Sequence, residues 1–175
     1  MILLFLCAFF SVQTIPTVGA KPKDSPTPLI EFYREIGYKS VGEAVSECEK
    51  HFKEEVKLPL MIPAIPFSHQ FGRFWDDKAH KTNDSLEIEY LNEKKPENFY
   101  KITIRPLKNK IDFKDKGNQK LYKLKDGQNA IYMELINQGF LVFEYGKWQY
   151  ILGINKKLSK EITPEILVEI ANSIS

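Results

Sequence analysis

The chain has 175 residues, of which 43% are hydrophobic, 27% charged and 13% aromatic, with nine Gly and ten Pro. This composition is that of a globular protein. It excludes a disordered chain, a collagen-like chain and a disulfide-stapled scaffold, because only two cysteines are present. A formal net charge of +2 is too small to favour nucleic acid as a partner. The sequence carries no catalytic signature motif, so it says more about architecture than about activity.

The N-terminal residues are typical of a signal peptide. Residues 1–20 contain no Lys, Arg, Asp or Glu, and residues 1–10 are almost continuously apolar. Small or modest residues end this segment at Ala20, and a charged stretch with regular prolines follows. We therefore expect a signal peptide that is cleaved after Ala20, and an exported, extracytoplasmic protein that is secreted or associated with the membrane. A segment kept as an N-terminal anchor is the alternative.

Removal of the signal peptide would leave Cys48 as the only cysteine, so no intramolecular disulfide could form and an apolar core would have to stabilise the fold. We expect residues 21–27 to be a tether and residues 28–175 to form a single α+β domain. The expected parts of this domain are a helical part at 28–57, an antiparallel sheet at 67–154 and a C-terminal helix at 163–174.

Two short amphipathic helices are expected at the start of the domain. The first follows Thr27 and ends before Gly37, and its apolar residues have helical spacing: Leu29, Phe32, Tyr33 and Ile36. The second begins after Ser40, which with Glu43 has the spacing of a capping box, and its apolar stripe runs to Phe52. Both helices are short, and we expect them to pack on a sheet.

A proline-rich apolar segment separates these helices from the sheet. Pro59, Pro63 and Pro66 exclude both a regular helix and a central strand, because proline lacks the backbone N–H that each of these needs. An extended segment that crosses the core, or an edge strand, is what the spacing allows.

From residue 67 the pattern changes to β, with turn signals at Asp126-Gly127 and Gly146-Lys147. Seven strands are expected at 67–75, 86–91, 99–106, 120–125, 128–136, 139–145 and 148–154. The short connections among the last four predict an antiparallel meander. A C-terminal helix then begins at Thr163-Pro164, and its apolar stripe should pack on one face of a curved antiparallel sheet.

Part of the sequence resembles a known family. The segments that carry the resemblance are Asp126-Gly127-Gln128-Asn129-Ala130-Ile131-Tyr132, Leu141-Val142-Phe143-Glu144, Trp148-Gln149-Tyr150 and 167–174. Residues 67–175 are in this respect similar to the domain-of-unknown-function family 4367, which is found mainly in Gram-positive, spore-forming bacteria. The resemblance implies an exported or membrane-attached protein, a half-barrel like that of lipoprotein carriers, and a sensing or binding module with no catalytic residues to transfer.

Aromatic residues of the expected sheet are the candidate ligand-binding site. By strand parity Phe67, Phe71 and Trp75 share one face, and Trp148 and Tyr150 share another. A curved sheet lined in this way could hold an acyl chain or a hydrophobic peptide, with residues 58–67 as a lid. The alternative is that these aromatic residues are simply the core between the sheet and the helices.

Clusters of polar residues indicate an alternative function, that of an enzyme. His69, Asp76, Asp77 and His80, with Asp84 close by, could bind a divalent metal and support a metal-dependent or hydrolytic enzyme, although their spacing matches no established ligand set. Cys48 and His51 stand three residues apart on the second helix, which suggests a Cys–His nucleophile pair. However, Cys48 lies on the apolar stripe, where a free thiol behaves as a small hydrophobe.

A basic stretch is the last feature with a possible partner. Residues 105–125 contain eight Lys or Arg and two Asp, a local net charge of +6. This stretch could contact an anionic membrane or wall surface, or its lysines could deter edge-to-edge aggregation of strands.

Taken together, the sequence predicts an exported, non-enzymatic cell-envelope protein without a cofactor. Its expected partner is a lipid, a hydrophobic peptide or an envelope protein, and nucleic acid is not expected. The alternatives are the enzyme built on His69, Asp76, Asp77 and His80, and a structural or interaction protein with no pocket.

Overall fold

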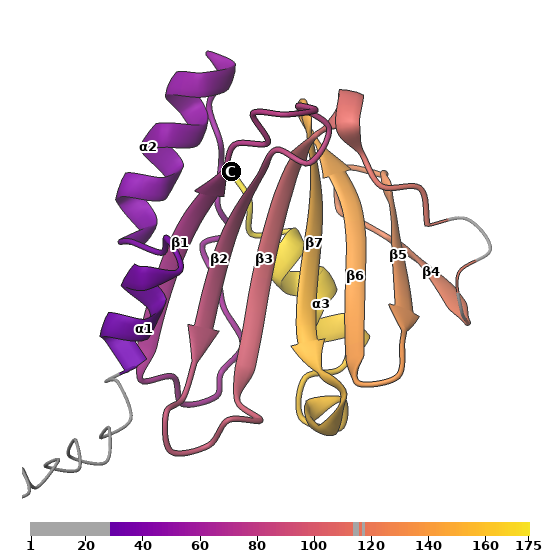
Figure 1. Ribbon diagram of the computed structural model, residues 1–175. Coiled ribbons are helices and arrows are strands. Elements are labelled where there is room, and N and C mark those ends of the chain that lie inside the picture. The colour runs from indigo at the N-terminus through magenta and orange to yellow at the C-terminus, as the bar shows by residue number, and fades with distance from the viewer. Residues whose placement is uncertain (1–28, 114–115, 117) are drawn as a thin grey trace, which may run out of the picture.

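The structure is a computed structural model that describes residues 29–113, 116 and 118–175, so the predicted signal peptide and tether lie outside the described residues. The described part contains one open antiparallel sheet of seven strands in the order β1-β2-β3-β7-β6-β5-β4 (Figure 1). The strands are β1 (His69–Trp75), β2 (Ser85–Leu91), β3 (Phe99–Pro106), β4 (Gln119–Lys123), β5 (Asn129–Glu134), β6 (Gln138–Tyr145) and β7 (Trp148–Asn155). The predicted α+β fold with a curved antiparallel sheet is confirmed.

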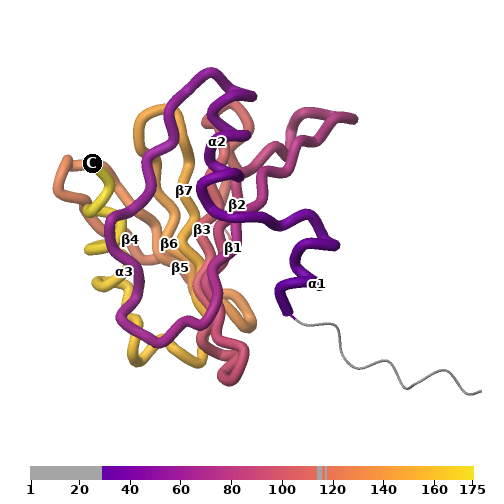
Figure 2. Tube along the Cα trace, turned by 90° about the vertical axis from the view of Figure 1, so that its left-hand side faces the viewer, coloured from indigo at the N-terminus to yellow at the C-terminus, as the bar shows by residue number. Residues whose placement is uncertain are grey.

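Helices occupy both ends of the chain. The α-helices of the described residues are α1 (Leu29–Glu35), α2 (Val41–Phe52) and α3 (Pro164–Ala171), and short 3-10 helices follow β3 and β7 at Leu107–Asn109 and Lys156–Leu158. Figure 2 shows that α3 and the extended segment 53–68 lie on one side of the sheet, and that α1 projects on the other side. No helix in the described part of the chain is long and apolar enough to cross a bilayer.

The sheet consists of two meanders that meet in its middle. β1, β2 and β3 pair in sequence, and β4 to β7 form the second meander, as the turn signals predict. The two join where β3 pairs with β7, from Tyr100 opposite Ile154 to Pro106 opposite Trp148. β4, the next strand after β3 along the chain, lies at the far edge of the sheet, which leaves the place beside β3 to β7.

The main core lies on the face of the sheet that α2, segment 53–68 and α3 cover. Every second residue of the central strands points into it, and the largest fully buried side chains include Tyr100, Ile102, Ile104, Tyr150, Leu152 and Ile154. Leu58 and Ile65 of the extended segment pack against this core. The prolines therefore produce what the sequence predicts, an extended chain that crosses the core.

The start of α2 is determined by its own residues. The Glu43 N–H donates to the Ser40 hydroxyl (3.3 Å), and the Ser40 N–H donates to the Glu43 carboxylate (3.1 Å), which is the predicted capping box. Ala44 and Cys48 are fully buried against β1. This close approach depends on Gly72 of β1, since a Cβ there would lie 2.8 Å from the Ala44 Cβ.

The helix α1 departs from the prediction. The four residues of its apolar stripe should share one buried face, but only Leu29 and Tyr33 pack against a small cluster on the opposite face of the sheet. Phe32 and Ile36 remain 47% and 43% exposed. The physical reason is the path of the chain: Lys39 pairs with the outer edge of β1 at Gly72, which leaves α1 beside that edge and only partly over the sheet.

A cluster of four charged side chains joins the segment after α1 to the sheet. Arg73 donates to Glu87 (2.7 Å), and the Lys101 ammonium lies 3.0 Å from both Glu87 and Glu89. The Tyr38 hydroxyl donates to Glu87 (3.0 Å) and to Glu89 (2.7 Å). Two positive and two negative charges cancel, so we interpret this cluster as a structural attachment of the segment after α1.

The cluster makes stability depend on acidic pH. Burial by itself raises the pKa of Glu87, but the charges of Lys101 and Arg73 outweigh it, and the net pKa lies below the ordinary value of 4.5. The contribution of Glu87 to stability is therefore fully present above pH 4.5 and is lost as the pH falls through its lower, folded-state pKa. We expect the stability difference between the wild type and Glu87→Gln, measured by urea unfolding, to shrink from about pH 5.5 to about pH 3. A difference that stays constant over this range would contradict the assignment, and Glu93→Gln in an exposed loop is the control.

Candidate functional site

The predicted aromatic site is divided between two faces and an edge of the sheet. Phe67 precedes β1 and packs beside Tyr90 against the main core, with ring centroids 5.6 Å apart. Phe71 is buried on the opposite face, where its ring stacks on Tyr33 at 4.3 Å. Trp75 is 51% exposed at the end of β1. The prediction that Phe67 shares a face with Phe71 and Trp75 is therefore wrong, because residue 67 lies outside the strand.

Trp148 and Tyr150 both lie in the main core, and the extended segment satisfies their polar groups. The Trp148 indole N–H donates to the Glu55 carbonyl (2.8 Å), and the Tyr150 hydroxyl donates to the Lys57 carbonyl (2.7 Å). The segment from 53 to 68 thus occupies much of the groove that the sequence predicts between sheet and helices. Trp148 also lines an open space at the end of the sheet where β3 ends and β6 turns into β7.

We call this space the upper hollow. It has a volume of about 370 Å³ and lies among the C-terminal end of α2, the end of β3 and the β6–β7 turn. Its lining residues are Phe52, Glu54, Pro106, Leu107, Lys108, Gly146, Lys147 and Trp148. The Phe52 and Trp148 rings meet edge to face, with centroids 5.3 Å apart, so aromatic surface forms part of the wall.

Charged groups surround the upper hollow. The Lys108 ammonium lies 5.5 Å from the centre of the Phe52 ring, and Lys147 forms an ion pair with Glu54. The same ion pair also borders a smaller hollow of about 210 Å³, which Trp148 and Tyr150 line as well. Two lysines and one glutamate leave the lining of the upper hollow with a net positive charge. The arrangement can therefore accept an apolar group that carries a negative charge.

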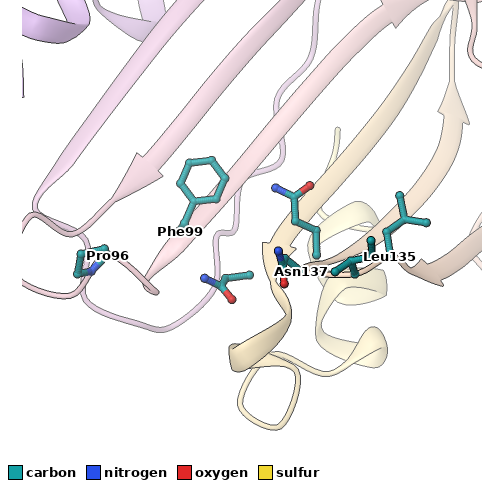
Figure 3. A pocket seen from close by; sticks show the side chains of 7 residues that line it. Pro96, Phe99, Leu135 and Asn137 are labelled. Carbon is teal, nitrogen blue, oxygen red and sulfur yellow. The ribbon is translucent and has the colours of Figure 1, made fainter.

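A second, more open hollow of about 590 Å³ lies at the opposite end of the strands, where β3 begins and β7 ends (Figure 3). It is lined by Pro96, Phe99, Leu135, Ile136, Asn137, Gln138 and Asn155, and we call it the lower hollow. Ile136 is 92% exposed in the turn between β5 and β6. The sequence pattern gives no sign of this hollow, because it predicts a strand that includes Leu135 and Ile136, whereas β5 ends at Glu134.

The structure does not bring the four predicted metal ligands into one site, because His69 lies at the other end of β1 from Asp76, Asp77 and His80. His69 begins β1 and Asp76 follows the end of the strand, and seven residues of extended chain span about 23 Å. Asp77 instead stabilises the β1–β2 loop: its carboxylate accepts from the His80 N–H (3.1 Å) and from the Asn83 amide (3.0 Å). The hydrogen bond from His80 is the main reason that the pKa of Asp77 is lowered.

Cys48 is fully buried in α2, and burial, with smaller effects of Glu49 and Asp84, raises the pKa of its thiol to about 12. A thiol of this kind is not a nucleophile at neutral pH, and the interpretation of Cys48 as a core residue holds. His51 does not serve as its base, since the His51 Nε2 faces the Asp84 carboxylate at 3.5 Å.

The basic stretch 105–125 is partly neutralised within the domain. Lys110 pairs with Glu144 (2.8 Å), and Lys120 lies 3.7 Å from Glu165. Lys108 instead lines the upper hollow. These pairings reduce the positive charge that the stretch can offer to an anionic surface, so contact with a membrane or wall polymer stays a prediction.

No protein-family model, no curated protein and no solved structure matches the chain. The class of the protein is therefore defined by its fold, an α+β domain with an open, curved, seven-stranded antiparallel sheet.

Proposed function

We propose that the protein is an exported, non-enzymatic binding module of the cell envelope, and that its ligand is a small hydrophobic molecule with an anionic group, held in the upper hollow. The observation that carries this proposal is an open hollow of about 370 Å³ whose walls include Phe52, Leu107 and Trp148 and whose lining includes Lys108. This volume is near the lower end of the range for small-molecule sites, about 300–1,000 Å³.

The driving force would be removal of apolar surface from water. Each 100 Å² of buried apolar surface contributes about 2.5 kcal/mol, and each buried methylene about 0.8 kcal/mol. Lys108 would hold the anionic group near the mouth, while Lys147 already has Glu54 as its partner. Trp148 of the predicted site keeps a role in this proposal as a wall of the upper hollow. Tyr150 lines the neighbouring smaller hollow instead, and Phe67, Phe71 and Trp75 do not take part.

The first test asks whether the protein carries a ligand from its host. Native mass spectrometry would compare the purified protein before and after organic extraction. We expect an excess mass that disappears on extraction, and its fragments would identify the chemical class. A bare protein mass that stays bare after incubation with a mixture of fatty acids would overturn the proposal.

The second test uses Trp148 as its own reporter. The chain has two tryptophans, and Trp75→Phe removes the exposed one, which lies outside the upper hollow. Titration with saturated fatty acids of increasing length should change the Trp148 fluorescence. Each added methylene should lower the Kd about fourfold, as about 0.8 kcal/mol per buried CH₂ requires, until the hollow is full.

A matched pair of variants locates the binding. Leu107→Asp places a carboxylate in the wall of the hollow, and we expect it to raise the Kd for the fatty acid by about tenfold or more, because the charge would be desolvated. Leu121→Asp on β4 is the control, since Leu121 is 62% exposed and lies outside the hollow. Equal effects of the two variants would place the ligand elsewhere.

A protein partner is the second candidate, because Leu135 and Ile136 expose adjacent apolar side chains at 46% and 92% beside the lower hollow. Native spectra separate the two candidates. A protein that co-purifies with the wild type and is lost with Ile136→Asp, but kept with Leu107→Asp, would favour the partner.

A further inference from the structure

Three potential metal ligands meet at the upper end of β1 and β2, although the sequence separates them widely. His51 belongs to the last turn of α2, Asp76 directly follows β1, and Asp84 directly precedes β2. One ligand atom from each lies within 4.8 Å of the others. Asp76 and Asp84 belong to the polar cluster that the sequence suggested, whereas His51 of α2 does not, and His69, Asp77 and His80 are not part of this group.

The separation of His51 and Asp84 fits shared ligation of an ion. The His51 Nε2 lies 3.5 Å from the Asp84 Oδ2. A hydrogen bond between such groups is shorter, about 2.7–3.2 Å. Two ligand atoms that each lie about 2.1 Å from one metal ion, at a tetrahedral angle, stand about 3.4 Å apart. The observed distance therefore matches two neighbouring corners of a metal coordination shell.

Asp84 is a buried carboxylate of the kind that can hold a metal ion. Its side chain is only 2% exposed, and buried carboxylates are normally paired or bound to a metal. The Asp77 N–H donates to the Asp84 Oδ1 (2.7 Å), which orients the carboxylate so that Oδ2 faces His51. The charge of Arg105 interacts with that of Asp84, but the guanidinium donates its hydrogen bonds to the backbone carbonyls of Thr82 (2.8 Å) and Asn109 (3.2 Å).

The His51 ring is held in place by apolar contacts. Its centroid lies 4.6 Å from that of Phe52 and 5.1 Å from that of Phe74, and its side chain is 31% exposed. The imidazole is therefore restrained on one side and open to solvent on the other, which provides a path for an ion to enter.

We propose that His51, Asp76 and Asp84 bind a divalent transition-metal ion, with Zn²⁺ as the best match. One imidazole nitrogen and two carboxylate oxygens suit Zn²⁺ better than Mg²⁺ or Ca²⁺, which prefer oxygen ligands alone. The ion would tie the end of α2 to both ends of the β1–β2 loop. The site shares no residue with the lining of the upper hollow, so this proposal does not depend on the proposed function.

The test is calorimetric titration of the chelator-treated, dialysed protein with Zn²⁺ alone, followed by thermal unfolding with and without the ion. We expect one Zn²⁺ per chain and a higher Tm with Zn²⁺, because an ion that binds only the folded state stabilises it. Co²⁺ in place of Zn²⁺ should give visible absorption bands from the bound ion. Absence of both heat and a Tm shift would overturn the proposal.

Variants distinguish this site from accidental surface binding. His51→Ala should raise the Kd for Zn²⁺ at least tenfold and remove the Tm shift, and Asp76→Asn should act in the same direction. His80→Ala is the matched control, because His80 lies 3.6 Å from Asp77 and its side chain is 76% exposed. Circular dichroism checks that each variant is folded. Binding that survives His51→Ala but is lost with His80→Ala would place the ion elsewhere and overturn the assignment.

Discussion

Replacement of Tyr150 by alanine is expected to lower the free energy of unfolding by about 3–5 kcal/mol. Tyr150 is fully buried in β7, its ring stacks on Phe143 with centroids 5.2 Å apart, and its hydroxyl donates to the Lys57 carbonyl (2.7 Å). Truncation removes the ring, leaves a cavity and deprives a carbonyl of its donor. Urea unfolding of wild type and variant, monitored by circular dichroism, measures the difference.

Tyr150→Phe separates the two contributions. This variant keeps the ring and removes only the hydroxyl, so we expect a loss of about 1 kcal/mol. Amide hydrogen exchange near Lys57 should become faster in both variants, because the hydrogen bond of Tyr150 attaches the extended segment to the sheet. If Tyr150→Ala and Tyr150→Phe lowered the free energy of unfolding by the same amount, the ring would not be the core element that its burial indicates.

Replacement of Gly72 by valine is expected to lower the free energy of unfolding by about 1–3 kcal/mol or more. A Cβ at this position would lie 2.8 Å from the Ala44 Cβ and 2.9 Å from the Val41 Cα. The second of these atoms belongs to the backbone, so α2 would have to move away from β1. Cys48 lies on the same face of α2, so the shift should also make its buried thiol accessible to labelling reagents.

Gly42→Ala is the matched control within α2. A Cβ at Gly42 would have no atom within 4 Å, and alanine favours a helix over glycine by about 0.5–1 kcal/mol. We therefore expect the opposite sign, a small increase in stability with no change in the labelling of Cys48. Destabilisation of similar size at both positions would contradict the view that the contact between α2 and β1 is what Gly72 allows.

The candidate site shows where sequence reasoning reaches its limit. Periodicity and aromatic content identified Trp148 and Tyr150 as residues that line the inner face of the sheet. These two signals could not identify the upper hollow, because the other walls of the hollow come from α2 and from the connection after β3. The same holds for His51 and Asp84, which are 33 positions apart and meet only because α2 packs across β1.

The local elements were determined by the sequence alone. Ser40 and Glu43 start α2 by their own hydrogen bonds, the Asp126-Gly127 turn sets the β4–β5 hairpin, and the prolines keep segment 53–68 extended. Such signals act over a few residues and need no partner from elsewhere in the chain. Only the tertiary structure decided that β3 pairs with β7, that α1 lies on the face opposite α3, and that Phe67 and Phe71 separate. These outcomes depend on which distant surfaces bury the most apolar area together, and no local pattern encodes that choice.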